Sequence, residues 1–237
     1  MGARLLVIGA HSADFVWRAG GAVAATTAAG GDAKVVALSY GERGESGELW
    51  KIAGQTVENV KRVRHAEAEQ AAAALGAEFE GLDMGDYPLD VRREGLESIA
   101  EVIRDYAPGV ILTHTDTDPF NPDHAAAHSA VVRARALAAG GGVDAAFRTV
   151  LPSQLLLFEP HQPELCAFIP TVFLDITDVI EAKNQAMAAM ESQVYLRTYY
   201  SQRAEQRGNH ARRVSGDRGI RYAEAFQRVL PQVVTAL

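Results

Sequence analysis

Cysteine is almost absent from this chain of 237 residues, and this excludes an internal disulfide. The only cysteine, Cys166, is expected to pack as a small hydrophobic residue in a reducing compartment, so we predict a cytoplasmic protein. No stretch approaches the roughly 18 uncharged apolar residues that a membrane span requires. No basic segment with a small-residue cleavage site precedes the first apolar run, so the sequence predicts no export signal.

Lysine is also scarce, with four residues against 19 arginines, and the net charge of -7 argues against a general nucleic-acid binder. Seven of the arginines lie between residues 197 and 221, against two acidic residues there. Arginine is the side chain best suited to recognise carboxylates and phosphates. The segment is either a solvated helix face with subunit contacts or a positive wall beside a small anionic substrate. We expect such a substrate, no nucleic-acid or membrane partner, and a homo-oligomer.

Apolar runs of strand length alternate with helical patterns along the chain, and no repeat or composition shift marks a domain boundary. This alternation is typical of α/β proteins, so we predict one domain over residues 1–237 with a doubly wound, mainly parallel sheet. Strands are predicted at 4–9, 34–39, 79–82, 110–113, 154–158 and 171–175. Helices are predicted at about 15–29, 57–75 (stopped by Gly76), 91–106, 122–139, 177–206 and 221–235.

Metal-ligand side chains follow two of the predicted strands. His11 and Asp14 come directly after the first strand, while His114, Asp116 and His124 follow the fourth. Because ligands of an open α/β sheet bind just outside the carboxyl ends of its strands, we expect these side chains to converge on one pocket. Two histidines and a carboxylate with an open position are typical of catalytic zinc, and iron, manganese or cobalt would suit the same ligands. His114 and Asp116 are candidates to orient the ligands.

Two further histidines allow two interpretations each. His128 lies one helical turn after His124 and either orients a ligand or is an exposed residue, and we favour the exposed residue. His161 lies between Pro160 and Pro163, in a stiff loop after a late strand. It is a candidate acid or base, and the alternative is a surface histidine.

Several segments together resemble a known zinc family. The PIG-L/LmbE-like N-acetylglucosaminyl deacetylases are similar to essentially the whole chain, through the motifs at His11 to Gly21, Asp123-His124 and Tyr222-Ala223-Glu224-Ala225-Phe226. The resemblance implies a Rossmann-like fold and a zinc ion held by His11, Asp14 and His124.

Two positions depart from the pattern of that family. The general base of the deacetylases is Ala13 here, and the histidine that stabilises the oxyanion is Asn121. Each of these functions is typically worth about 10²–10⁴-fold in rate. Asparagine can still donate a hydrogen bond, whereas alanine cannot move a proton. The chain is therefore expected to be an inactive deacetylase or to perform different chemistry.

The stretch from His11 to Gly21, together with Gly41-Glu42-Arg43-Gly44-Glu45-Ser46, is similar to the 4-oxalomesaconate hydratase branch of the same family. That resemblance implies addition of water to a small unsaturated oxo-tricarboxylate in the bacterial breakdown of gallate and protocatechuate. The reaction needs groups that move protons and cations that hold carboxylates. The candidate proton-transfer groups are Glu45 or Glu48 and His161. The candidate substrate ligands are Arg18, Arg43, Asn121 and one or more of the C-terminal arginines.

Two alternatives stay open at this point. One is a zinc-dependent deacetylase of an N-acetylated sugar that takes its base from another position. The other is a protein that keeps the fold and binds a ligand without turnover. Only Ala13, Asn121 and the excess of arginine separate these functions, because a neutral sugar gives less reason for so many cations.

Overall fold

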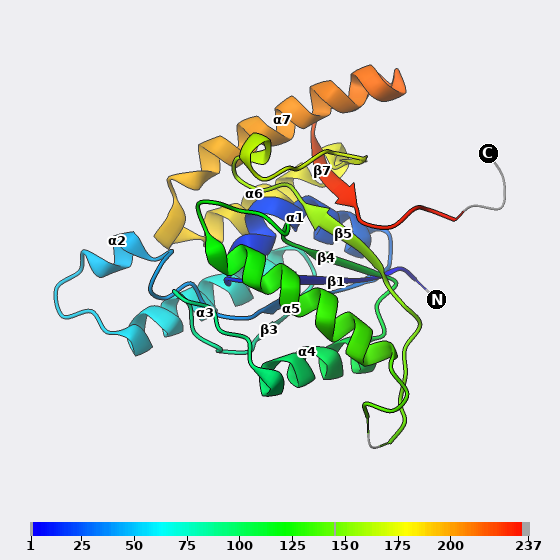
Figure 1. The fold of residues 1–237 in the computed structure, drawn as a ribbon. Helices are drawn as coiled ribbons and strands as arrows, with labels where there is room; N and C mark the ends of the chain where they lie inside the picture. The colour runs from blue at the N-terminus through cyan, green and yellow to red at the C-terminus, as the bar shows by residue number, and fades with distance from the viewer. Residues whose placement is uncertain (1, 145, 234–237) are drawn as a thin grey trace.

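The computed structural model describes residues 2–144 and 146–233, and a seven-stranded sheet forms its centre (Figure 1). The strands are β1 (Arg4–Gly9), β2 (Asp32–Ala37), β3 (Glu78–Gly81), β4 (Val110–Thr113), β5 (Gln154–Phe158), β6 (Val172–Asp175) and β7 (Ala223–Arg228). Their order is β3-β2-β1-β4-β5-β7-β6, and β7 runs antiparallel to both of its neighbours. The first five strands pair in parallel. The predicted doubly wound, mainly parallel α/β fold is confirmed.

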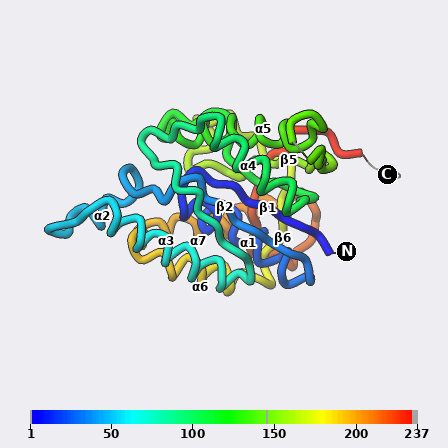
Figure 2. The backbone as a smooth tube through the Cα atoms, turned by 90° about the horizontal axis from the view of Figure 1, so that it is seen from below, coloured from blue at the N-terminus to red at the C-terminus, as the bar shows by residue number. Residues whose placement is uncertain are grey.

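Helices cover both faces of the sheet, as Figure 2 shows. They are α1 (Asp14–Ala28), α2 (Gly47–Trp50), α3 (Val57–Ala74), α4 (Arg93–Tyr106), α5 (Pro122–Ala139), α6 (Ile180–Ala189) and α7 (Leu196–Ser215), with short 3-10 turns η1 (Pro163–Leu165), η2 (Thr177–Val179) and η3 (Glu191–Gln193). The helices α4 and α5 pack together on one face, and α1, α3 and α6 cover the other. The helix α7 packs on β6 and β7. None of the helices in the described ranges is long and apolar enough to cross a membrane.

Local sequence explains where several elements begin and end. The run from Leu5 to Ile8 is buried on both faces, as expected of a central parallel strand. The helix α5 begins with Pro122 after Asn121, whose Oδ1 accepts from the Asp123 amide at 3.2 Å. Gly76 follows the end of α3 with φ +71°, in the left-handed conformation expected of a residue that stops a helix.

The predicted helix over residues 177–206 is wrong because the chain breaks between α6 and α7. Ser192, in the 3-10 turn η3, donates its amide to Glu67 Oε1 at 2.8 Å and its hydroxyl to Glu67 Oε2 at 2.6 Å. Arg64 Nη1 donates to the same hydroxyl at 2.7 Å. These contacts with α3 replace helical hydrogen bonds. Residues 177–206 contain no glycine or proline, so nothing in this segment indicates the break.

The predicted helix over residues 221–235 is also wrong, since residues 223–228 form β7 and residues 234–235 lie outside the described residues. Alanine, glutamate, glutamine and arginine are good helix formers, and this propensity favoured the helix. Tertiary context overrides it: β7 fills the gap between β5 and β6, with Glu224 and Phe226 on one face and Ala223 and Ala225 on the other.

Candidate metal and substrate site

The site lies where the order of the sheet reverses. The neighbouring strands β1 and β4 continue into connections that run to opposite sides of the sheet, and ligands of doubly wound folds bind outside the carboxyl ends of such strands. His11 follows β1, Asp14 begins α1, and His124 lies in the first turn of α5. Gly9 permits this arrangement, because a Cβ there would lie 2.9 Å from the Cβ of Asp14.

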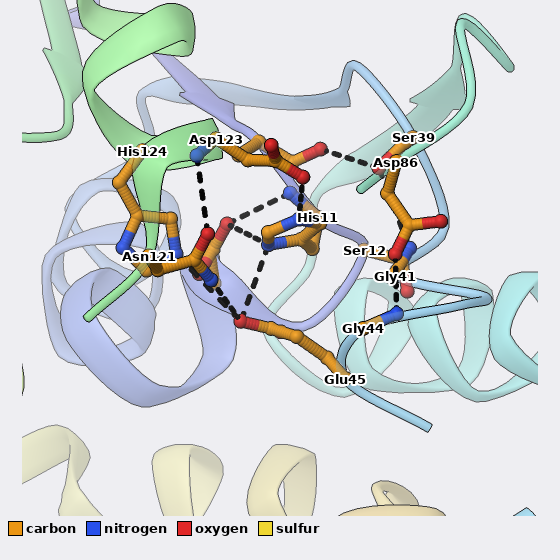
Figure 3. Close-up of polar contacts among 12 residues, drawn as sticks. His11, Ser12, Ser39, Gly41, Gly44, Glu45, Asp86, Asn121, Asp123 and His124 are labelled. Carbon is orange, nitrogen blue, oxygen red and sulfur yellow. Dashed lines mark hydrogen bonds and ion pairs between the residues drawn. The ribbon is translucent and has the colours of Figure 1, made fainter. Parts of the chain in front are cut away.

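Four buried or half-buried side chains converge at this point. One ligand atom from each of His11, Asp14, Glu45 and His124 lies within 4.8 Å of the others. Figure 3 shows Glu45 facing His11, with Asn121 beside it. His11 Nδ1 lies 3.2 Å from Glu45 Oε1, and His124 Nε2 lies 3.6 Å from Asp14 Oδ1. Neither nitrogen has a hydrogen-bond partner among residues 2–144 and 146–233. Two unpartnered imidazole nitrogens beside carboxylates fit a divalent cation, and the cluster could hold a metal.

The other nitrogen of each imidazole is held by a carboxylate. His11 Nε2 lies 3.3 Å from Asp123 Oδ2, and His124 Nδ1 lies 2.7 Å from Asp118 Oδ2. Asp123 is in turn fixed by the backbone amides of Tyr87 and Leu89, both at 2.9 Å. Such partners orient histidine ligands and set their tautomer. They leave His11 Nδ1 and His124 Nε2 directed at the centre of the cluster.

Asp116 was expected to orient a ligand, and the structure corrects this expectation. Its side chain is exposed, and Asp118, two residues later, makes the contact with His124. His114 does lie beside the cluster: its Nε2 is 3.0 Å from Asp14 Oδ2, and its ring stacks on that of His124 at 4.0 Å. His128 was expected to be exposed, but it is half-buried and its Nδ1 donates to the His114 carbonyl at 2.8 Å.

The charges of the cluster are mutually dependent. Burial opposes ionisation of Asp14, but the imidazoles of His114 and His124 outweigh it and lower the pKa of that carboxyl. The pKa of Glu45 is also lowered against the effect of burial, chiefly by His11. Burial opposes a charge on His11, yet Glu45, Asp123 and Asp14 raise the pKa of that imidazole. The cluster thus favours a positive charge at its centre, and a bound cation would take the place of the proton on His11.

A cavity of about 310 Å³ opens beside the cluster. Besides Asp14, Glu45 and His124, it is lined by Arg18, Asn121 and His161, which were all predicted as site residues. Arg18 is the only arginine or lysine lining it in the described part of the chain. The Arg18 side chain is 8% exposed, its Nε lies 3.6 Å from Asp14 Oδ1, and this Nε has no hydrogen-bond partner within the described ranges.

The structure separates the two glutamates that the sequence left as alternatives. Glu45 lines the cavity, and its Oε1 accepts from Asn121 Nδ2 at 2.9 Å. Glu48, in α2, points to solvent, where it forms an ion pair with Lys51 at 2.6 Å. The turn of α2 rotates Glu48 away from the cavity. Arg43 is likewise exposed and contributes only its backbone amide, which donates to Asp86.

The C-terminal arginines do not face the cavity, which corrects the expectation that some of them hold substrate. Arg203 and Arg207 both form ion pairs with Glu159 at the end of β5. Arg197 donates to the Met187 carbonyl near the end of α6, and Arg212 donates to the Ile220 carbonyl in the segment between α7 and β7. Four of the seven arginines between residues 197 and 221 thus contact other parts of the described chain.

His161, in the loop after β5, also lines the cavity. Its ring stacks on Tyr199 at 4.1 Å, and its Nδ1 lies 3.5 Å from the Tyr200 hydroxyl. Burial, together with the nearby charges of Arg18 and Arg203, lowers the pKa of His161. The imidazole is thus held in place by two aromatic rings beside the cavity.

Several residues of the site carried no recognisable signal in the sequence. Gln193 and Tyr200 line the cavity, and Gln193 Nε2 donates to the Glu45 carbonyl at 3.1 Å. Trp17 donates its indole N–H to Gln193 Oε1 at 3.0 Å and stacks on Tyr200. The break between α6 and α7 brings Gln193 here. That break was not predicted, so neither was this residue.

The family model described as PIG-L, GlcNAc-PI de-N-acetylase, matches residues 6–135, more than half of the chain. The chain belongs to the PIG-L family. Within it, the chain is 43% identical over 235 residues to a 4-oxalmesaconate hydratase of Pseudomonas putida, a match that covers 98% of this chain and 91% of that protein. It is also 30% identical to a diacetylchitobiose deacetylase of Thermococcus kodakarensis, over 80% of this chain and 70% of the relative.

A solved structure is also similar to nearly the whole chain. The crystal structure of GalB, the 4-carboxy-2-hydroxymuconate hydratase from Pseudomonas putida KT2440, matches with a TM-score of 0.96 and 43% identity, and covers 99% of each chain. Both hydratase comparisons thus extend over nearly all of this chain, including α6, α7 and β7, which the family model does not reach.

Proposed function

We propose that this protein is a metal-dependent hydratase that adds water to a small unsaturated oxo-tricarboxylate, with 4-oxalomesaconate as the preferred substrate. The observation that carries the proposal is the 43% identity with a hydratase over nearly the whole chain. The chemistry of the cavity supports it independently. Position 13, where the deacetylases of the family have their base, holds a buried alanine in the hydrophobic core.

Zinc is the metal that we propose, with His11 Nδ1, Asp14 and His124 Nε2 as its ligands. Two imidazoles and a carboxylate leave a coordination position open for catalysis, and the unpartnered nitrogens support this set. A bound zinc ion would supply Lewis-acid chemistry by polarising oxygen atoms of the substrate. Asp118 and Asp123 would orient the two imidazoles.

Glu45 and His161 are the residues to which we assign proton transfer. In the hydration, the oxygen of water bonds to the β-carbon of a conjugated double bond, and a proton is added to the α-carbon. One C=C bond and one O–H bond break, and one C–O and one C–H bond form. Glu45 is ionised because its pKa is lowered, so it can accept the proton of water. His161, which lines the same cavity, would donate the proton to carbon.

Arg18 is the group to which we assign recognition of a substrate carboxylate. Its unpartnered Nε and its position on the cavity wall support this role. Asn121 already donates to Glu45 and would donate its second amide hydrogen to the substrate. A cavity of about 310 Å³ suits a small acid, since it lies at the lower end of the range for ligand pockets, roughly 300–1,000 Å³.

The test is to mix the purified protein with 4-oxalomesaconate and to follow its ultraviolet absorbance. Loss of the conjugated chromophore, abolished by a chelator and restored by zinc, is the expected result. Release of acetate from N-acetylglucosamine conjugates, with no effect on the unsaturated acid, would overturn the proposal in favour of a deacetylase. No reaction with either substrate would favour a protein of the same fold that binds a ligand without turnover.

A further inference from the structure

Two sequence motifs that the proposed chemistry does not use meet inside the protein. One is the pair Gly20-Gly21 in the middle of α1, and the other is Glu224 in β7. The helix α1 contacts both β7 and α6. Glycine in the interior of a helix is less favourable than alanine, so two in succession call for a physical reason.

Close approach of Glu224 provides that reason at Gly21. Its Oε1 accepts from the Gly21 amide at 2.7 Å, and its Oε2 accepts from the Ala22 amide at 2.8 Å. A Cβ at Gly21 would lie 2.9 Å from the Glu224 carboxyl carbon and 2.6 Å from Ile176 Cγ2. Only glycine lets a carboxylate reach the backbone of a helix from the side at this position.

Lys183, from α6, completes the arrangement. Its Nζ donates to Glu224 Oε1 and, at 3.1 Å, to the Trp17 carbonyl. In a regular helix the Trp17 carbonyl accepts from the Gly21 amide, which here donates to Glu224. Lys183 and Glu224 are 2% and 5% exposed, so the pair is buried. An ion pair from two other elements is therefore attached to the backbone of α1 at the turn that begins with Trp17 and Arg18.

We propose that Lys183 and Glu224 are positioning residues that fix this turn so that Arg18 faces the cavity, and this inference rests on the proposed role of Arg18 in binding a substrate carboxylate. Two contacts restrain the Arg18 side chain: its Nε lies 3.6 Å from Asp14 Oδ1, and its guanidinium lies 5.9 Å from the centre of the Phe158 ring. Because Asp14 lies one turn earlier on α1, the direction of Arg18 still depends on the backbone of the helix that carries both residues. A small cavity behind Arg18 is lined by both Lys183 and Glu224.

The experiment compares three variants: the neutral pair Lys183→Met with Glu224→Gln, the single change Arg18→Met, and their combination. For the neutral pair we expect KM for 4-oxalomesaconate to rise about tenfold while kcat changes less than about threefold, since binding is lost and the proton-transfer groups stay in place. Zinc content should stay unchanged. If the pair acts through Arg18, adding Arg18→Met to the neutral pair should raise KM by less than it does in the wild-type protein. If the neutral pair and Arg18→Met change KM by independent factors that multiply, the inference is overturned. It is also overturned if the variant with the neutral pair folds and keeps the KM of the wild-type protein.

Loss of stability must be separated from loss of positioning. Arg104→Met is the matched control, because it removes a part-buried ion pair with Glu101 on the opposite face of the sheet, and it should leave KM unchanged. If the neutral pair does not fold, Glu224→Asp replaces it. That change keeps the charge but withdraws the carboxylate from the α1 backbone. It should still raise KM, and an unaltered KM would again contradict the inference.

A readout without turnover keeps this inference distinct from the proposed function. The chain has two tryptophans, so in a Trp50→Phe background the emission reports Trp17 alone. Propane-1,2,3-tricarboxylate is the probe, and its binding should change the Trp17 emission. If the wild-type protein does not hydrate 4-oxalomesaconate, the proposed function fails. The inference then stands if Glu224→Asp weakens binding of this probe as Arg18→Met does, and falls if Glu224→Asp binds the probe like the wild-type protein.

Discussion

Two buried polar clusters of this protein differ in whether their hydrogen-bonding groups are satisfied. At the carboxyl ends of β1 and β4, His11 Nδ1 and His124 Nε2 are buried and lack a partner within the described ranges. Around Arg64, which is fully buried, the side chain donates to Glu67, Ser192 and Gln193 and to the Tyr40 carbonyl. Buried polar groups in native proteins are nearly always paired, so unpaired groups call for an explanation. Single unpaired atoms such as Arg104 Nε and Tyr106 Oη also occur elsewhere, whereas the two imidazole nitrogens lie together beside the carboxylates of Asp14 and Glu45. A group of unpaired ligand atoms around one point, rather than buried charge alone, indicates the metal site.

The largest effect is expected from removing an unsatisfied group. His124→Ala should lower the zinc content from about one ion per chain to a small fraction, and should reduce kcat/KM by about 10³-fold or more, because a metal supplies several kcal/mol of transition-state stabilisation. Elemental analysis and the absorbance assay measure the two effects. His65→Ala is the control, since His65 is partly exposed, forms an ion pair with Glu69 and does not belong to the metal cluster of the described residues. A His124→Ala protein that retains its zinc would contradict the ligand assignment.

Removing Arg64 from its hydrogen-bonded cluster should lower the stability of the protein and leave metal binding intact. Arg64→Met leaves Glu67 buried with fewer partners, and removing one partner of a buried ion pair costs about 3–5 kcal/mol of unfolding free energy. Chemical denaturation measures that loss. The zinc content of the folded fraction should stay at the wild-type value, because no atom of Arg64 belongs to the metal cluster. An Arg64→Met protein that loses zinc but keeps its stability would contradict this assignment of Arg64 to the fold rather than to the metal site.

The sequence predicted the centre of the site better than its walls. His11, Asp14 and His124 could be found because each follows a strand or begins a helix, and strand ends of a parallel sheet converge by topology. Gln193 and Tyr200 reach the cavity only because the chain breaks between α6 and α7, and the cause of that break is Glu67, more than 120 residues away. Asp118 instead of Asp116 holds His124 through a loop conformation that spacing alone does not determine.

The fold was predictable to a similar degree and for similar reasons. Strands with continuous apolar runs, such as β1 and β4, are specified by their own residues. The strand β7 is specified by its neighbours, since its residues favour a helix in isolation. Glu224 is the clearest case, because its intrinsic propensity favours a helix, and its actual partners are the α1 backbone and Lys183.

A smaller effect is expected from the proton-transfer group beside the unsatisfied nitrogens. Glu45→Gln keeps an acceptor for Asn121 but cannot take a proton from water, so kcat should fall by about 10²-fold or more. Steady-state absorbance measurements at saturating substrate check this. Glu48→Gln provides the matched control in the same segment and should leave kcat unchanged, since Glu48 points to solvent. Equal losses in both variants would refute the separation of the two glutamates.

The smallest effect is a displaced pH profile rather than a lost rate. Burial, with the charges of Arg18 and Arg203, lowers the pKa of His161, and the proposed role of His161 as the acid requires its protonated form. In the pH profile of kcat/KM, the apparent pKa of the high-pH limb should therefore lie below the ordinary pKa of histidine, about 6.5. Arg203→Met removes one of the cations that lower this pKa without altering the lining of the cavity. The pKa of His161 should then rise, His161 should stay protonated to higher pH, and the limb should move to higher pH. Titration of the His161 ring by NMR measures the same change directly. A limb that moves to lower pH, or that persists unchanged in His161→Ala, would show that another group is the acid.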